Sequence, residues 1–296
     1  MRPFELYTAK DVRHAVALLA EHAASVKILA GGTDLLVELK HGVSVPRAVV
    51  DISRASDLKH IALTPEGLGI GALATHADIM RSPIVRELCP ALVEAAHSIG
   101  AVQTRNLGTL GGNLVTGVSS MDSGPALLAL DASVTIAGPA GDRCMPLASF
   151  FLGPRKTALV TGELVKEIVV PQASLRKPTC FLQFGLRKGQ ALALVNAAAS
   201  LRAKGEPAAF DEVRIALGAV APTVMRARAA EAFLQGRAIS AEAIAEAARI
   251  AAGEARPITD FRASAEYRRD LIAVLVRRAL TQACALAQAP LAEAMP

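Results

Sequence analysis

The sequence predicts an α+β protein made of two small α/β units followed by a third unit of strands and helices. Three observations predict this organisation. A β-α-β pattern occupies residues 1–56, shorter strands and turns follow from residue 57, and the final third runs from strands into alanine-rich helices. A chain of 296 residues suffices for such units, because domains usually contain about 100–200 residues.

The first unit, residues 1–56, is assigned from its hydrophobic periodicity. The segment "DVRHAVALLAEHA" has helical spacing, and "VKILA" is typical of a short buried strand. A helix then begins at Thr33 or Asp34 and ends near Gly42, before the strand "RAVVDIS". Gly31 and Gly32 lie where the strand meets the helix. They indicate either a tight turn or a place where a phosphate approaches the backbone.

The second unit, residues 57–174, contains more turns. Pro65-Glu66-Gly67 separates two strands, and the glycines at 67, 69 and 71 lie within a strand, which excludes a dinucleotide-binding fingerprint there. We expect "PIVRELCPALVEAAHSIG" to be helical. The segment "SGPALLALDASVTIAGPAGDRCMPLASFF" predicts a helix, a strand and a hairpin, and "GELVKEIVVP" a further strand. Pro171 and Pro178 mark the boundary of this unit.

The third unit, residues 175–296, begins with the strands "CFLQFGLRKG", "ALALVNAAASLRA" and "EVRIALGAVAP". Two helices follow, "AEAIAEAARIAAGEA" and "AEYRRDLIAVLVRRALTQACALAQ". In the last helix the leucines face a core, and the arginines, Arg268 among them, are expected on a solvated face.

Composition excludes several classes of function. The chain has no run of about 18 apolar residues and no apolar signal core, so we expect a cytoplasmic protein without a membrane span. Four scattered cysteines and six histidines show no metal-ligand spacing, and no metal site is expected. The net charge of +5 is dispersed and aromatic residues make up only 3%, which argues against nucleic acid as a partner.

A second glycine pair, Gly111 and Gly112, lies between Thr109 and Asn113. Two glycine-containing loops can together supply the backbone N–H groups that a diphosphate needs. The sequence lacks the G-x-x-x-x-G-K-[ST] motif of nucleoside triphosphatases, and "GPRKT" at 153–157 has only a similar composition. The two pairs therefore indicate a dinucleotide cofactor.

Together these motifs resemble one family. The segments "ILAGGTDLL", "QTRNLGTLGGNL" and "DSGPALLALDA", with "GALATHADI", "GELVKEIVVP" and "LRKGQALALVNAAA", are similar to the FAD-binding (medium) subunit of the molybdenum hydroxylases. That family includes xanthine dehydrogenase, carbon monoxide dehydrogenase and 4-hydroxybenzoyl-CoA reductase. The resemblance covers essentially the whole chain.

The resemblance implies a fold like that of vanillyl-alcohol oxidase (PCMH type), in which two subdomains hold FAD and a C-terminal antiparallel sheet with helices follows. The first loop would wrap the diphosphate and ribityl chain together with the second loop, Gly100 would allow close passage of the cofactor, Asp122 would accept hydrogen bonds from it, and Val165 would pack near the flavin. The implied FAD-binding residues are Ile28, Leu29, Ala30, Gly31, Gly32, Thr33, Asp34, Leu35, Gly100, Thr109, Leu110, Gly111, Gly112, Asn113, Asp122, Val165 and Gln183.

Two of these residues also have ordinary structural interpretations, and two segments depart from the family pattern. Asp122 could cap the following helix, and Val165 could be a core residue. The sequence has Gly117-Val118-Ser119 where A-S-P is frequent, and Gln183 where lysine is frequent. Loss of that lysine removes a positive charge near the cofactor. The scattered cysteines argue against the extra iron-sulfur cluster of 4-hydroxybenzoyl-CoA reductase.

The resemblance also implies a function. A large partner subunit would carry the molybdenum cofactor and a small one two [2Fe–2S] clusters, in a dimer of heterotrimers. This chain would pass electrons to NAD or a quinone and would contain no catalytic residue of its own. The alternatives are a self-sufficient flavin-dependent oxidoreductase of the same fold and a partner protein that has lost the flavin. The substrate and the electron acceptor stay open.

Overall fold

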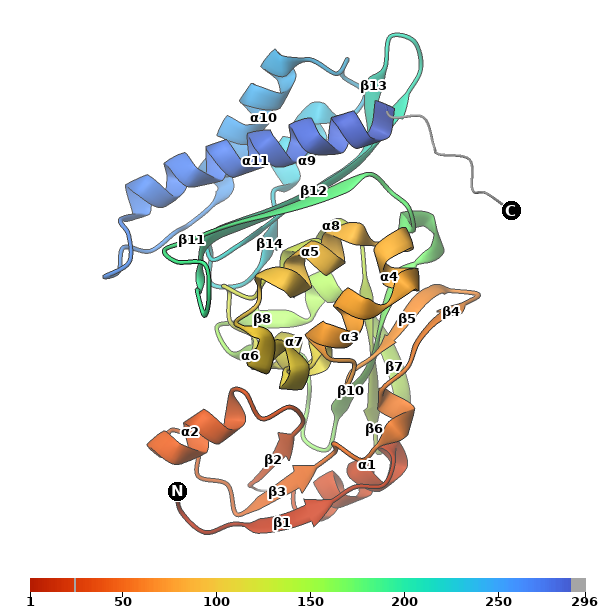
Figure 1. Cartoon of the computed structure of the whole chain (residues 1–296), viewed down its shortest axis with the longest axis vertical. Coiled ribbons are helices and arrows are strands. Elements are labelled where there is room, and N and C mark those ends of the chain that lie inside the picture. The colour runs from red at the N-terminus through yellow and green to blue at the C-terminus, as the bar shows by residue number, and fades with distance from the viewer. Residues whose placement is uncertain (24, 289–296) are drawn as a thin grey trace.

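The computed structural model describes residues 1–23 and 25–288, and residues 289–296 of the predicted third unit lie outside the described residues. Three main sheets follow one another along the long axis of the molecule, with the N-terminal sheet at the bottom of Figure 1 and the C-terminal sheet and its helices at the top. A two-stranded ribbon of β8 (Phe151–Gly153) and β9 (Lys156–Thr157) is added to them.

The first sheet is parallel, with the strand order β1-β3-β2. Its elements are β1 (Glu5–Thr8), α1 (Val12–Glu21), β2 (Val26–Leu29), α2 (Leu35–His41) and β3 (Ala48–Asp51). The predicted β-α-β pattern is confirmed, and Gly42 ends α2 in the left-handed conformation at φ 69°. Strand β1 was not predicted, because four mostly exposed residues give little hydrophobic signal.

The second sheet has five antiparallel strands in the order β4-β5-β10-β6-β7. These strands are β4 (Ile61–Thr64), β5 (Gly67–Gly71), β6 (Ser133–Gly138), β7 (Gly141–Pro146) and β10 (Leu164–Pro171). Its helices are α3 (His76–Arg81), α4 (Pro83–Leu88), α5 (Pro90–Ser98), α6 (Val102–Leu107), α7 (Leu110–Thr116) and α8 (Ser123–Ala129). The predicted turn at 65–67 lies between β4 and β5 as expected.

The helix expected over residues 83–100 is in fact two helices, α4 and α5, which meet at Cys89. Cys89 has φ −143° and ψ 57°, outside the helical region. Pro90 explains the break, because proline lacks an N–H group and excludes the helical conformation from the residue before it. The continuous helical spacing of the apolar residues concealed this break in the sequence.

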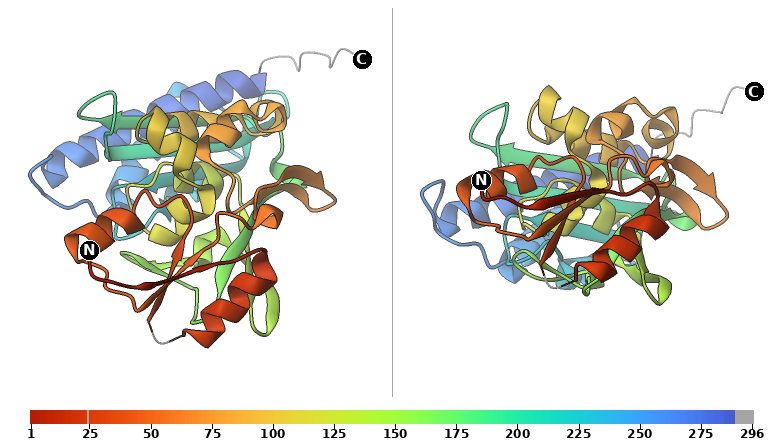
Figure 2. Two further views of the ribbon diagram at one scale, coloured as in Figure 1. Left: turned by 60° about the horizontal axis from the view of Figure 1, so that its bottom comes forward. Right: turned by 90° about the horizontal axis from the view of Figure 1, so that it is seen from below.

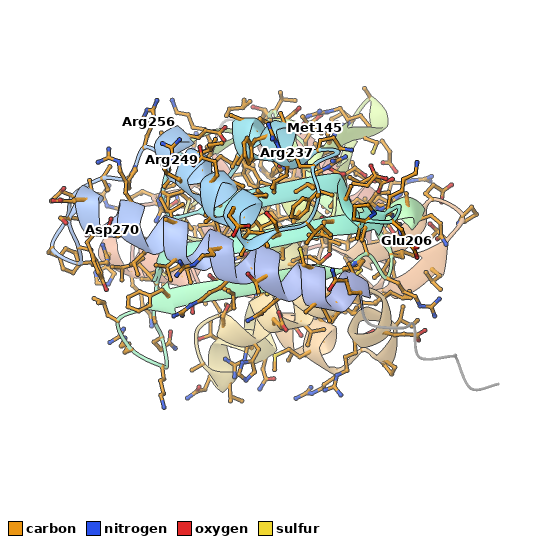
Figure 3. All side chains as sticks on the ribbon, turned by 90° about the horizontal axis from the view of Figure 1, so that it is seen from above. Met145, Glu206, Arg237, Arg249, Arg256 and Asp270 are labelled. Carbon is orange, nitrogen blue, oxygen red and sulfur yellow. The ribbon has the colours of Figure 1, made fainter. Side chains whose placement is uncertain are left out.

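The third sheet is antiparallel, in the order β11-β12-β13-β14. It comprises β11 (Thr179–Gly185), β12 (Ala193–Lys204), β13 (Ala209–Gly218) and β14 (Met225–Arg226), and the helices α9 (Arg228–Leu234), α10 (Ala241–Glu254) and α11 (Ala265–Gln288) follow. Helices α10 and α11 cover its outer face, as Figure 3 shows from above, whereas α5 and α8 lie against the inner face. The two views in Figure 2 show the same layers from below.

Arg268 of α11 differs from the solvated position expected of it. Its side chain is only 4% exposed, and its guanidinium donates to the Leu194 carbonyl at 2.8 Å and to Asp260 at 2.9 Å. It ties the start of α11 to β12. Periodicity alone could not reveal this role, because its partners come from other elements.

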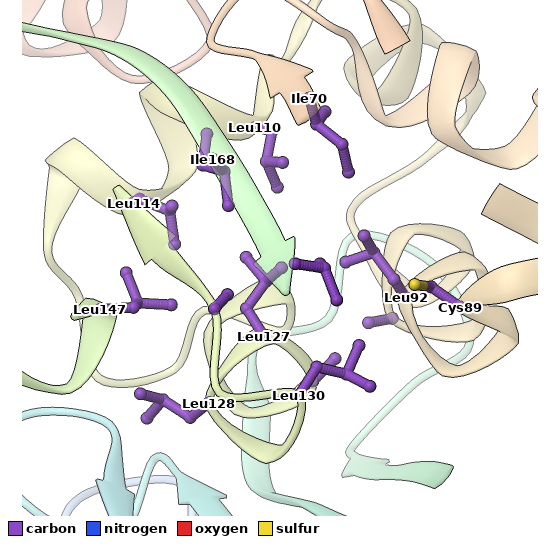
Figure 4. Close-up of a cluster of buried hydrophobic side chains, with 14 of the residues drawn as sticks. Ile70, Cys89, Leu92, Leu110, Leu114, Leu127, Leu128, Leu130, Leu147 and Ile168 are labelled. Carbon is purple, nitrogen blue, oxygen red and sulfur yellow. The ribbon is translucent and has the colours of Figure 1, made fainter. Parts of the chain in front are cut away.

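The main apolar core lies between the second sheet and the helices α3, α4, α5, α7 and α8, where leucine and isoleucine side chains converge (Figure 4). It is continuous with the inner face of the third sheet, because Phe181, Ala198 and Ala216 belong to the same cluster. A second core lies between the third sheet and its outer helices. The aliphatic interior expected from the composition is therefore observed.

A buried ionic cluster joins the second and third units. Arg226 of β14, with a side chain 5% exposed, donates to Asp131 at 2.7 Å and to Glu231 at 2.7 Å. Glu231 also accepts from the Ile215 amide at 2.8 Å. Asp131 follows α8, so this cluster fixes the third sheet on that helix.

We expect Glu231→Ala to lower the free energy of unfolding by about 3–5 kcal/mol, because the buried Arg226 guanidinium keeps only Asp131 as its carboxylate partner and the buried Ile215 amide loses its acceptor. The matched control is Glu246→Ala, which breaks the exposed pair with Arg249 on the outer face (Figure 3) and should cost less than about 1 kcal/mol. Urea unfolding measures both. Equal losses would show that the buried cluster adds no more stability than an exposed ion pair.

Candidate cofactor-binding site

A cavity of about 370 Å³ is lined by residues in or next to all three main sheets. Its walls come from the loop after β2, the start of α7, the segment before α8, and the loop between β11 and β12. The predicted site residues that line it are Ile28, Ala30, Gly31, Gly32, Thr33, Asp34, Leu35, Gly100, Thr109, Gly111, Gly112, Asn113, Asp122 and Val165. The structure thus brings together residues that are up to 137 positions apart, Ile28 and Val165.

Three predicted residues do not line the cavity. Leu110 is fully buried in the main core. Leu29 ends β2, and its carbonyl accepts from the Ile52 amide at 2.9 Å. Gln183 lies behind the wall and donates to Asp122 at 3.3 Å. Leu29 and Leu110 therefore support the loops, whereas Gln183 touches a lining residue.

The first glycine pair serves two different structural needs. Gly32 has φ +73°, which favours glycine and makes it the turn residue. At Gly31 a Cβ atom would lie 1.8 Å from the carbonyl oxygen of Leu107, so no side chain fits. Gly31 lets the first loop touch the segment that leads into the second loop. The structure therefore shows a tight turn and, beside it, a close approach of two backbones.

The backbone amides of the first loop are available to a ligand. Among the described residues, the N–H groups of residues 31–34 have no hydrogen-bond acceptor. Loops with several unsatisfied amides bind anions, because each amide presents a partial positive charge. Asp34 stands at the start of α2 without capping it, and burial raises the pKa of its carboxyl group.

The second glycine pair lies in the first turn of α7 and not in an open loop. Thr109 caps this helix by accepting from the Gly112 amide at 3.1 Å. The amides of Leu110 and Gly111 donate to the carbonyls of Ala74 and Ala72, at 2.9 and 3.0 Å. A Cβ on Gly111 would lie 2.7 Å from that of Ala72. The backbone donors of Gly111 and Gly112 are thus used within the protein, which differs from the predicted cradle of free amides.

Asp122 is 5% exposed and is held by neighbouring strands of the third sheet. Asn196 donates to its carboxylate at 2.6 Å and Gln183 at 3.3 Å, and these two residues face each other across β12 and β11. Its side chain makes no capping hydrogen bond to α8, so the capping interpretation is wrong. Burial raises the pKa of Asp122 to about 6, against the opposing effect of its neutral donors.

Val165 of β10 and Gly100, which follows α5, both line the cavity. Val165 is 4% exposed and belongs to the main core, as its structural interpretation expects, and its position near the flavin stays a prediction. Gly100 has φ +53° and accepts from the Gln190 amide at 3.1 Å. Gln190 also donates to Thr104 at 3.0 Å, which fastens the loop between β11 and β12 to the second unit.

Several lining residues carried no site prediction. Among them are His76, Thr104, Thr116, Ser120 and the segment 190–192. His76 lies in "GALATHADI" and residues 190–192 in "LRKGQALALVNAAA", so their motifs had been noticed without a role. Their positions depend on packing between units, which a single sequence does not disclose.

Of the departures from the family pattern, Gly117 ends α7 at φ +62° and Val118 lines the cavity.

Two further findings bear on the kind of site. Within residues 1–23 and 25–288, no group of three or more histidine, cysteine or acidic side chains could hold a metal ion. None of the helices described in that part of the chain combines the length and apolarity needed to cross a membrane.

Comparison with known proteins agrees with the geometry. Residues 2–173 match the family "FAD binding domain in molybdopterin dehydrogenase", and residues 181–283 match "CO dehydrogenase flavoprotein C-terminal domain". The carbon monoxide dehydrogenase medium chain of Hydrogenophaga pseudoflava is 34% identical over 95% of this chain and 97% of its own. The xanthine dehydrogenase FAD-binding subunit of Escherichia coli O157:H7 is 32% identical over 95% and 96%.

Solved structures show the same fold. A carbon monoxide dehydrogenase from H. pseudoflava that lacks the Mo-pyranopterin moiety of its molybdenum cofactor has a chain that superposes with a TM-score of 0.92 at 36% identity, covering 97% of this chain and 99% of that one. Quinoline 2-oxidoreductase from Pseudomonas putida gives a TM-score of 0.89 at 29% identity, covering 97% and 99%.

The fold and the matches along the chain define an FAD-binding flavoprotein. The chain belongs to the FAD-binding medium subunits of the molybdenum hydroxylase family. The resemblance seen in the sequence, the α+β fold with its C-terminal antiparallel sheet, FAD as the cofactor, and the role of an oxidoreductase subunit are thereby confirmed.

We expect Gly31→Ala to lower the free energy of unfolding by about 1–3 kcal/mol and to weaken FAD binding, because the new methyl group forces the first loop away from Leu107. The control is Gly253→Ala in α10, where a Cβ meets nothing within 4 Å and helix propensity predicts a gain of about 1 kcal/mol. Thermal unfolding and FAD titration measure both effects. Unchanged FAD affinity in Gly31→Ala would contradict the role of this contact.

The stability of the cofactor-free chain should depend on Asp122 through pH. Its pKa is raised on folding, so its contribution is present below the unfolded pKa of about 4 and is lost as pH rises through about 6. We expect the wild type to lose about 3 kcal/mol more than Asp122→Asn between about pH 4 and about pH 7. Urea unfolding at both pH values tests this. Parallel pH profiles would mean that Asp122 ionises in the folded chain as it does in water.

Proposed function

We propose that this chain carries one FAD and passes electrons between [2Fe–2S] clusters of a small partner subunit and an external acceptor, NAD or a quinone. A large partner subunit would hold the molybdenum cofactor, and two heterotrimers would form the assembly, in the cytoplasm. The observation that supports this most strongly is the cavity at the junction of the glycine loops, in a chain whose relatives match along its whole length.

The cavity has donors suited to an FAD diphosphate. The amides of residues 31–34, without acceptors among the described residues, supply hydrogen bonds to an anionic group. Thr109 and Asn113 border the same space from the second loop. We assign the diphosphate to the first loop, and a neighbouring position on the ribityl chain to the second.

The other end of the cavity suits the flavin ring. Val165 and the neighbouring Leu164 and Leu159 give it an apolar wall. Asp122, held by Gln183 and Asn196, presents a hydrogen-bond acceptor to a hydroxyl or amine of the cofactor. We further propose that the three units, residues 1–56, 57–174 and 175–296, each contribute one wall, because each supplies its own sheet.

A bound flavin accepts single electrons and can deliver two together. The residues of this chain bind and orient it, and the loop fastened by Gln190 to Gly100 and Thr104 limits the access of water. None of these tasks needs a catalytic acid, base or nucleophile. The alternative, a self-sufficient flavoenzyme, needs a substrate pocket of its own. It has less support, since the cavity is lined by the loops assigned to the cofactor.

We expect the purified chain to show flavin absorption without the broad shoulder of an iron-sulfur cluster, and to release one FAD per chain on denaturation. The test compares the visible spectrum before denaturation with the FAD content of the supernatant. A colourless chain is then titrated with added FAD. Failure to bind FAD in both experiments would reject the proposed function and leave the glycine pairs as structural turns.

A further inference from the structure

His76 is a buried histidine at the edge of the cavity. It is the first residue of α3, after the capping residue Thr75, and is only 2% exposed. Its backbone amide donates to the Gly108 carbonyl at 3.1 Å, and its side chain borders the cavity. The imidazole is thus fixed at the junction between the second unit and the two glycine loops.

The Nδ1 atom of this ring is buried and has no hydrogen-bond partner among the described residues. Buried polar atoms are nearly always paired, and an orphan calls for a partner that the protein chain does not supply. Burying a histidine without a partner destabilises the fold. An aliphatic residue would fill the same space at lower cost, so the ring points to a ligand.

The surroundings of the ring indicate which ligand. A Cβ on Gly108 would lie 3.3 Å from His76 Cδ2 and 3.6 Å from the Thr33 hydroxyl, so these two side chains flank one space. A Cβ on Gly31 would lie 3.2 Å from Gly108 Cα, so the loop with the free amides borders it too. Rotation of the ring by half a turn exchanges Cδ2 with Nδ1 and places a nitrogen on this side.

Burial and one nearby cation set the charge of His76 in the free chain. Burial and, second to it, the Arg105 guanidinium on α6 together lower the pKa of His76 to about 4, so the ring is neutral at pH 7 in the free chain. An anion at the ring would reverse this effect by favouring the imidazolium. Other charged or titratable groups stand on α3, on the packed helices α4 and α5, and across the cavity, namely Asp78, Arg81, Arg86, Glu87, Glu94, His97, Asp34 and Asp122.

We propose that the His76 imidazole hydrogen-bonds the diphosphate of the bound cofactor and takes up a proton from solvent when the cofactor binds. This inference rests on the proposed function, because it assigns the diphosphate to the first loop. The proton adds to a ring nitrogen and no covalent bond to the cofactor forms. His76 is then a binding residue that couples cofactor affinity to pH.

The test is the pH dependence of FAD affinity, measured by fluorescence titration of the cofactor-free chain. Affinity should fall with rising pH by up to about tenfold per pH unit between about pH 5 and about pH 7, the limit for one linked proton. The amide of His76→Asn keeps a hydrogen-bonding atom near the Nδ1 position but does not titrate in this range. In this variant the change of FAD affinity per pH unit should therefore be smaller than in the wild type. The control is His97→Asn on the exposed side of α5, which should keep the wild-type slope.

Calorimetry in two buffers of different ionisation enthalpy measures directly how many protons the chain takes up when FAD binds. Because it does not need the His76→Asn variant, it still tests the proposal if that variant fails to fold. Asp122 titrates in the same range, so the measurement uses wild type and Asp122→Asn. Proton uptake that persists in Asp122→Asn supports His76, and uptake that disappears assigns the proton to Asp122 and overturns the proposal. Equal slopes in wild type and His76→Asn, with FAD still bound, would overturn the role of His76 but leave the proposed function intact. A wild type that binds no FAD rejects this proposal and the proposed function together.

Discussion

The contact between Gly31 and the Leu107 carbonyl is the constraint on which the cavity depends. Gly31 lies in the loop after β2 of the first sheet, and Leu107 ends α6, a helix that packs on α3, so this contact sets how closely the first loop approaches the second loop. Any side chain at position 31 would separate them. The turn at Gly32 follows immediately, and the amides of residues 31–34 have no acceptor among the described residues. The cavity lies along this junction because the backbones touch there without side chains between them.

The two glycine pairs look alike in the sequence but act differently. In the first, one glycine makes the turn and the other the contact, and the amides stay unpaired among the described residues. In the second, both glycines sit inside the first turn of α7, where their amides pair with Ala72 and Thr109. Position 111 requires glycine because α7 packs against Ala72 there and leaves no room for a side chain. The first pair therefore provides the donors, and the second holds α7 close enough to form the opposite wall.

The sequence predicted the elements well wherever a local pattern determines them. The strands and turn of residues 61–71, the hairpin of β6 and β7 and the limits of α11 all follow from hydrophobic period and turn residues. It missed β1, whose residues are mostly exposed, and the break at Cys89, where apolar spacing continues through a proline. Most predicted lining residues came from the family resemblance. His76, Thr104 and Asn196 were missed, because each acquires its role from a residue in another unit.

The pKa values of Asp122 and His76 determine the charge of the cavity, and both depend on which groups surround the two side chains. Among the described residues, Asp122 is buried beside neutral hydrogen-bond donors and no cation, so burial raises its pKa to about 6. His76 Nδ1 has no partner in the same part of the chain, and burial together with Arg105 lowers the pKa of this residue to about 4. Lysine, frequent in the family at the position of Gln183, would keep Asp122 ionised throughout the physiological range. Glutamine donates a hydrogen bond without a fixed charge. Solution pH and the bound cofactor therefore set the charge at Asp122, and the positive field at the proposed diphosphate end would come from backbone amides, Arg105, Arg155 beside Asp34, and any proton gained by His76.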